Sequence, residues 1–316
     1  MASAHSDVTT IHVGGAAAPP VARRRKVRLA PYLLILPAII MLLLAMGYPL
    51  GWQIWASFMK FGLKQQFGAP PDFVGLANYV TIFTDSTVWG VVGRSLLFCI
   101  VNAVLTVVIG VALALLMNAV NKAIRLILQI ALLLAWAMPV VAAMTVWIWL
   151  FDWRRGVINY VLTSMGFNFS NYVWLGTAMG LYFVATVVVV WMSVPFVAFS
   201  IYAGLTQVSE EVMEAASLDG ATSFKRFTSI IVPMIRPVLM IVALLQIIWD
   251  LRVFTQIRML QDSQMPLDSD LLGTYIYRLG VSSGDFSMAS ALSIFVLILT
   301  IVFSIAYVLQ LVKEDS

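Results

Sequence analysis

Acidic, small and apolar side chains alternate in one connecting segment, SEEVMEAASLDGATSFKRFTSIIVP, an arrangement suited to binding another protein. Ser209 can cap a helix that Gly220 then ends, since glycine readily adopts the left-handed conformation found after helices. Thr222 or Ser223 can start a second helix that ends before Pro233. We therefore expect a helix–glycine–helix knob whose contact residues are Glu214, Ala215, Ala216, Leu218, Asp219, Gly220, Ala221 and Phe224.

The sequence contains few residues that could act as catalytic groups. Both histidines, His5 and His12, fall in a polar N-terminal stretch, and the single cysteine, Cys99, lies in an apolar run. The commonest general base and metal ligand is thus missing from the folded part. No GxxxxGK[ST] loop that could cradle phosphates is present either. We expect no catalytic residue, no metal and no cofactor bound by this chain.

Polar and aromatic side chains inside apolar runs are a second candidate site. Neutral sugars bind to aromatic faces and hydrogen-bonding groups, and intramembrane charge is costly enough to suggest a function. A substrate path predicted on this basis contains Gln246, Trp249, Asp250, Arg252 and Trp191. A structural alternative remains open, in which Arg252 pairs with Asp250 or reaches interfacial water.

The composition places the chain in a membrane. Hydrophobic residues make up 61% and charged residues 11% of the sequence, whereas soluble domains carry about 25% charged residues. The net charge of +4 owes much to a basic cluster at residues 23–28. Such a cluster beside an apolar run sets membrane topology and attracts anionic lipid. We expect membrane lipid, and no nucleic acid, as a partner.

Six apolar runs are long enough to cross a bilayer, which requires about 20 residues in a helix. None shows the alternating pattern of a membrane strand. The sequence predicts an all-α integral membrane protein with about six transmembrane helices, near residues 32–56, 95–119, 126–151, 174–205, 231–257 and 287–312.

The remaining segments define the predicted organisation. A disordered basic tail, residues 1–28, precedes a transmembrane domain at 29–312, and a short tail follows at 313–316. Lysine and arginine counts favour cytoplasmic termini. Segments 57–94 and 259–286 are then external, and the loop 206–230 that carries the knob is cytoplasmic.

The knob also carries a family signature. Glu214-Ala215-Ala216, Gly220 and the Ile230, Val232, Pro233 group resemble the EAA motif of inner-membrane permeases of binding-protein-dependent ABC importers, with Val232 where leucine is usual. The similarity extends over roughly residues 30 to 310 through pieces such as FVGLANYVTIF and WAMPVVAAMTVWIWLFD. These pieces resemble the carbohydrate branch, of the maltose, trehalose and glycerol-phosphate type. The last external loop departs from that branch at Asp262-Ser263-Gln264-Met265-Pro266.

The resemblance implies a type I ABC importer permease fold and a division of labour. The knob would dock into a cytoplasmic ATPase subunit, so that two such subunits bind ATP and Mg while this chain does not. A second, homologous permease subunit and an external solute-binding (lipo)protein would complete the assembly in the bacterial inner membrane. Among substrates, a disaccharide such as trehalose or maltose is expected, with glycerol phosphate as the runner-up.

Two other classes of protein fit the sequence less well. An ion-coupled secondary transporter would place ionisable residues near the membrane midplane, where the sequence offers no clear carboxylate. A membrane enzyme would need a nucleophile, a base or a metal cluster, and none can be named.

Overall fold

A computed structural model describes residues 30–264 and 269–314 of the chain. The structure divides into two compact units, the first ending at Pro49 and the second beginning at Leu50. The predicted tail at 1–28, with its basic cluster and both histidines, lies outside the described residues.

The first unit contains α1 (Ala30–Leu42), the π-helical turn η1 (Leu43–Gly47) and the start of α2 (Tyr48–Ser57). Every side chain described between Leu33 and Pro49 is exposed. A helix that is apolar on all sides belongs in lipid or against other membrane helices rather than in water. This unit therefore contributes to a membrane span.

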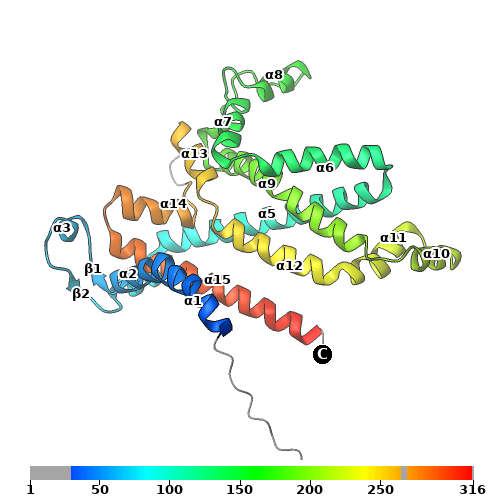
Figure 1. The fold of residues 1–316 in the computed structure, drawn as a ribbon. Coiled ribbons are helices and arrows are strands. Elements are labelled where there is room, and N and C mark those ends of the chain that lie inside the picture. Colours follow the sequence, from blue (N-terminus) through cyan, green and yellow to red (C-terminus); the bar gives the residue numbers. More distant parts are fainter. Residues whose placement is uncertain (1–29, 265–268, 315–316) are drawn as a thin grey trace, which may run out of the picture. The chain divides into compact units, whose positions relative to one another are not determined.

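Three long helices form the core of the second unit: α5 (Ser86–Ala119), α9 (Ala178–Leu205) and α12 (Val232–Leu251). They run side by side in Figure 1. Gly110 of α5 permits close packing, because a Cβ at this position would lie 2.4 Å from Cγ1 of Val197 on α9. Small residues of this kind let membrane helices approach closely.

The other described elements connect or cover these core helices. Two short strands, β1 (Met59–Lys60) and β2 (Asp72–Phe73), pair antiparallel, with Met59 opposite Phe73. The helical elements are α3 (Leu63–Gln66), α4 (Ala77–Thr84), α6 (Lys122–Ala137), α7 (Val140–Leu150), α8 (Val157–Ser164), the 3-10 turn η2 (Trp174–Gly176), α10 (Glu210–Leu218), α11 (Ser223–Arg226), the π-helical turn η3 (Phe227–Ile231), α13 (Thr255–Gln264), α14 (Leu272–Tyr277), the π-helical turn η4 (Arg278–Ser282) and α15 (Phe286–Glu314).

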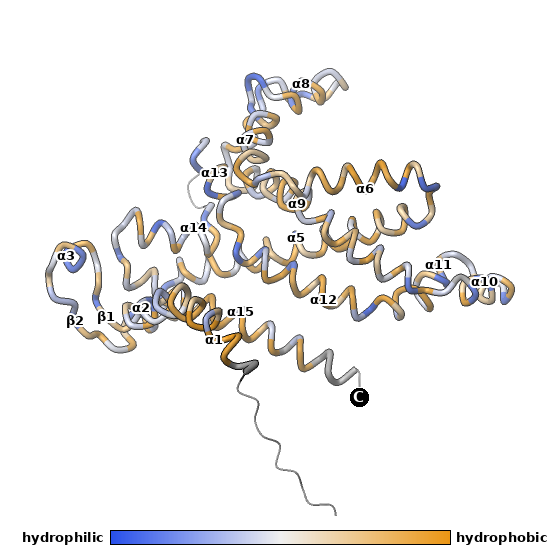
Figure 2. Tube along the Cα trace, viewed as in Figure 1, coloured by the Kyte–Doolittle hydropathy of each residue, from blue (hydrophilic) through white to orange (hydrophobic). Residues whose placement is uncertain are grey.

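The all-α membrane fold predicted from the sequence is confirmed. Five helical stretches of the described chain are long and apolar enough to cross a membrane, and a bent helix pair can supply a sixth. Figure 2 shows apolar residues along the core helices and polar residues collected toward their ends.

The third expected span, 126–151, is not one straight helix. It consists of α6 and α7, which meet at an angle of 101°. Met138 is extended (φ −70°, ψ 127°) and Pro139 follows it. Proline disfavours the helical conformation of the residue before it and lacks a donor for the helix ladder. The expected span is thus present as a bent helix pair, and the bend at Pro139 is sharper than a kink within one helix.

Several boundaries also differ from the expected ones. Helix α5 begins at Ser86 instead of 95, because the Asp85 side chain accepts a hydrogen bond from the Thr87 amide (2.7 Å) and caps the helix there. The expected span 231–257 breaks after Leu251, before α13. The expected C-terminal tail is shorter, since α15 continues to Glu314.

The knob and the polar segments lie at opposite ends of the second unit. Figure 1 shows α10 and α11 at one end of the core helices and the β1–β2 hairpin, α3 and α14 at the other. Isolated contacts hold the latter end together, among them Gly62 opposite Asp285 and a hydrogen bond from the Ser287 amide to the Phe61 carbonyl.

Candidate functional site

The knob has the helix–glycine–helix order that its sequence predicts. Helix α10 begins after Ser209, whose hydroxyl accepts a hydrogen bond from the Val212 amide (3.4 Å). The helix ends at Leu218, and Gly220 in the turn that follows has a φ of +76°. The Ala221 amide donates back to the Ala216 carbonyl (3.0 Å), which closes the C-terminal turn.

The second helix of the knob differs from the expected one. Thr222 caps α11 by accepting a hydrogen bond from the Lys225 amide (3.3 Å), but the helix does not end before Pro233. It continues through the π-helical turn η3 into α12. Pro233 lies directly after the π-helical turn η3, as the second residue of α12.

The knob exposes apolar groups that a lone subunit would normally bury. Leu218 is 89% exposed and Phe224 is 76% exposed. Glu214, Ala215, Asp219 and Gly220 are also exposed, and Ala216 and Ala221 are half-buried. The structure thus brings all eight predicted contact residues together on one protrusion. Apolar groups exposed beside acidic ones are typical of a protein-binding surface.

The predicted path residues are not gathered on one surface. Gln246 and Asp250 are 0% and 4% exposed and face the core. The Gln246 amide nitrogen Nε2 donates to Asp250 Oδ1 at 2.9 Å. Arg252 is exposed and forms no ion pair with Asp250 in the described structure. The pairing of Arg252 with Asp250 that the sequence left open is therefore not formed.

Trp249 instead belongs to an aromatic group that the sequence did not reveal. Its ring lies 5.0 Å from Phe196 on α9, in an edge contact, and Phe196 lies 6.4 Å from Trp136 on α6. Trp249 and Trp136 are 41% and 53% exposed. Three helices thus contribute one partly open aromatic face. No local pattern marks Phe196 or Trp136, since their neighbours in space are distant in sequence.

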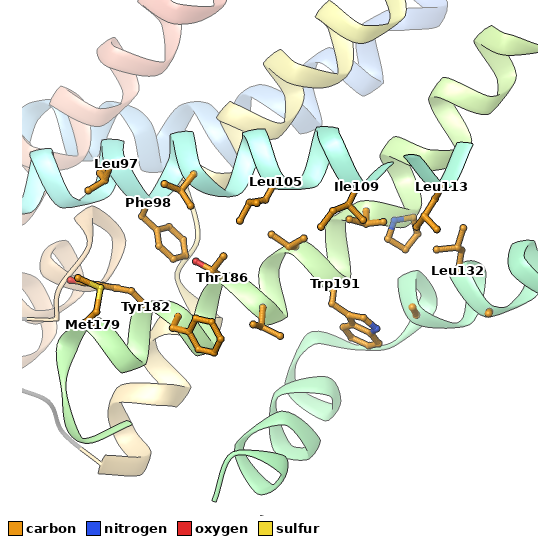
Figure 3. Close-up of a pocket in the computed structure, with 18 of the residues that line it drawn as sticks. Leu97, Phe98, Leu105, Ile109, Leu113, Leu132, Met179, Tyr182, Thr186 and Trp191 are labelled. Atoms are coloured by element: carbon orange, nitrogen blue, oxygen red, sulfur yellow. The ribbon is translucent and has the colours of Figure 1, made fainter. Parts of the chain in front are cut away.

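Trp191 lies elsewhere, on a groove between α5, α6 and α9. The groove has a volume of about 1010 Å³. Figure 3 shows Trp191 beside it together with Thr186 and Tyr182, across from Leu105 and Ile109 of α5. Nearly all of its lining is apolar, so it offers few hydrogen-bond partners to a sugar. Trp191 also contacts the Trp147 ring edge-on, with centroids 5.5 Å apart.

The fold and the exposed knob together define a class: a polytopic membrane protein with a helical protrusion at one end of its core helices. Comparison with known proteins agrees with this class. Residues 106–311 match the family of binding-protein-dependent transport system inner membrane components, and the chain belongs to this family.

Individual relatives match over nearly the whole chain. The diacetylchitobiose uptake system permease protein DasB of Streptomyces coelicolor is 36% identical, covering 99% of this chain and 96% of that protein. The trehalose/maltose transport system permease protein MalF of Thermococcus litoralis is 31% identical, covering 87% and 91%. The resemblance to permeases of carbohydrate ABC importers is thereby confirmed.

Solved structures show the same fold at lower identity. A bacterial ABC transporter involved in import of the acidic polysaccharide alginate contains a chain that superposes with a TM-score of 0.76. The match has 22% identity and covers 89% of this chain and 94% of that one. The multi-pass permease fold is therefore shared across distant sequences.

Proposed function

We propose that this chain is the membrane-spanning subunit of an ATP-driven importer and forms, with a second permease subunit, an alternating-access path for a carbohydrate of disaccharide size. Relatives named for diacetylchitobiose and for trehalose/maltose support a sugar of this size. A relative named for sn-glycerol-3-phosphate, from Yersinia pestis, is 29% identical, so that phosphate ester is the competing substrate.

The observation that carries the proposal is the exposed knob. Leu218 and Phe224 project from a capped, acidic protrusion. A groove on a cytoplasmic ATPase subunit would cover these side chains, and closure of two ATPase subunits around ATP and Mg would move the knob as a rigid body. The end of the bundle that bears the knob is then cytoplasmic, as are both termini, and the protein lies in the bacterial inner membrane.

The aromatic face formed by Trp249, Phe196 and Trp136 is the proposed sugar contact. Aromatic rings pack against the apolar face of a sugar ring and leave its hydroxyls free for polar groups. Gln246 and Asp250 lie one helical turn apart next to Trp249, but both are buried on α12, which packs against α5 and α9. They would reach a sugar only when α12 separates from α5, which fits a path that opens alternately to the two sides.

Reconstitution of the complete importer tests this function. Liposomes would contain this chain, the second permease subunit and the ATPase subunits, with the solute-binding protein on the outside. We expect uptake of labelled diacetylchitobiose, trehalose or maltose that needs both ATP and the binding protein. Deletion of 209–229 should abolish uptake while the chain still inserts, and normal ATP-driven uptake without the knob would refute the proposal.

A secondary transporter makes the opposite prediction in the same liposomes. It would take up sugar without the other subunits and lose that uptake on addition of an ionophore. The same panel, extended by sn-glycerol-3-phosphate, assigns the substrate class.

A further inference from the structure

A single arginine bridges the two helices of the knob. Arg226, the last residue of α11, donates from Nη1 to the Ser217 hydroxyl in the last turn of α10, at 2.6 Å. Its Nη2 donates to the Ser223 hydroxyl at 3.3 Å. Ser217 in turn donates to the Met213 carbonyl at 2.8 Å. The guanidinium therefore links α10 to the helix that continues into α12.

Few contacts of the described side chains fix α10 to that helix. The chain between them turns at Gly220, where an added Cβ would meet no atom within 4 Å. Every described side chain of α10 is exposed or half-buried. Among the side chains that the structure describes, no other hydrogen bond or ion pair joins α10 to α11. Without the arginine, α10 could swivel about the glycine turn.

Lys225, the basic residue next to Arg226, can be compared with it directly. Lys225 is exposed, and its ammonium group makes no hydrogen bond or ion pair with the described side chains. Arg226 is half-buried and spans two hydroxyls. A planar guanidinium can hold two acceptors in fixed directions, which an ammonium group does less well. The two basic residues thus have different roles in the same turn.

We infer that Arg226 is a positioning residue for coupling: its bond to Ser217 fixes α10 to the α11–α12 helix, so that movement of the docked knob reaches the transport path. This inference rests on the proposed function. Loss of the bond would leave the ATPase docked and active, but its movement would reach α12 incompletely. The expected defect is wasted ATP rather than a failure to assemble.

The reconstituted importer tests this inference through two rates measured together, sugar uptake and ATP hydrolysis stimulated by the binding protein. For R226A and for S217A we expect uptake to fall about fivefold while hydrolysis stays within about twofold of the unaltered protein. K225A removes the same charge one residue away and should leave both rates unchanged. R226K combined with S217D restores a charged pair across the turn and should recover most of the uptake.

Each other outcome overturns the inference. A proportional fall in both rates would indicate impaired docking or folding. If R226A lowered the uptake per ATP and S217A did not, Arg226 would contact the ATPase directly. Uptake per ATP equal to that of the unaltered protein in both variants would show that the bond is dispensable. Failure of the unaltered assembly to couple ATP to uptake would instead remove the proposed function itself.

Discussion

Gly220 is the residue on which the shape of the knob depends most directly. Its φ of +76° lies in the left-handed region, where a residue with a Cβ costs about 1–2 kcal/mol more than glycine. The turn has open space around it, so this cost is conformational and not steric.

Replacement of Gly220 by alanine should therefore strain the knob without displacing its neighbours. We expect sugar uptake by the reconstituted importer to fall severalfold while the chain accumulates in the membrane normally. Gly93, which has a negative φ and no atom within 4 Å of an added Cβ, gives a matched control, because alanine there should be tolerated. Equal uptake by G220A and G93A would contradict the role given to this turn.

Leu218 and Phe224 test the docking surface at the same scale. Because both side chains are exposed, replacing them by serine should cost the isolated chain little stability. Interface anchors of this size commonly contribute about 1–4 kcal/mol to binding, so the L218S/F224S pair should lose most of its ATPase subunit on co-purification. F167S alters an exposed aromatic (55%) that follows α8, away from the knob in the sequence, and should retain the subunit.

At the scale of elements, the close approach of α5 and α9 depends on a glycine, Gly110, which has no side chain. A Cβ on Gly110 would overlap Val197, at 2.4 Å from Cγ1 and 2.7 Å from Cβ. Overpacking of this kind costs about 1–3 kcal/mol.

We accordingly expect G110A to lower the thermal unfolding midpoint of the detergent-solubilised chain by several degrees. G110A/V197A makes room for the added methyl group and should recover some of the loss. A double variant no more stable than G110A would show that the two side chains do not compete for space.

Sequence reasoning succeeded for elements whose causes are local. Ser209, Gly220 and Thr222 specify the two caps and the turn of the knob by their own backbone preferences. Hydropathy identified the apolar stretches because it, too, depends only on residues that are close in the sequence. The sharpness of the bend at Pro139 could not be predicted, because a proline in a membrane helix can either kink or interrupt it, and the neighbouring helices decide between these outcomes.

The direction in which each side of a helix faces also cannot be predicted from the neighbouring residues in the sequence. Gln246 and Asp250 were predicted to line a path, and nothing in the sequence indicated that both side chains are buried when the helices pack. Phe196 and Trp136 join Trp249 only because three helices converge there. A helix that is apolar on most sides gives no periodic signal from which these orientations could be read.

At the scale of the whole molecule, the proposed orientation can be tested with thiol chemistry. The chain has a single cysteine, Cys99, which is 2% exposed and should not react. L218C and R155C place exposed thiols on the knob and on the loop before α8. In intact cells with a permeable outer envelope, a membrane-impermeant maleimide should label R155C and spare L218C. Labelling of L218C before the inner membrane is opened would reverse the topology.

The unbroken helical path from Ser223 to Leu251 makes α11, η3 and α12 a single lever. At 1.5 Å per residue it is roughly 40 Å long. A tilt of roughly 5° about the end next to the knob would therefore move the far end by about 3–4 Å, enough to separate a pair of touching rings. Trp249 lies near that far end, so a small angular step imposed at the knob is magnified where the aromatic rings meet.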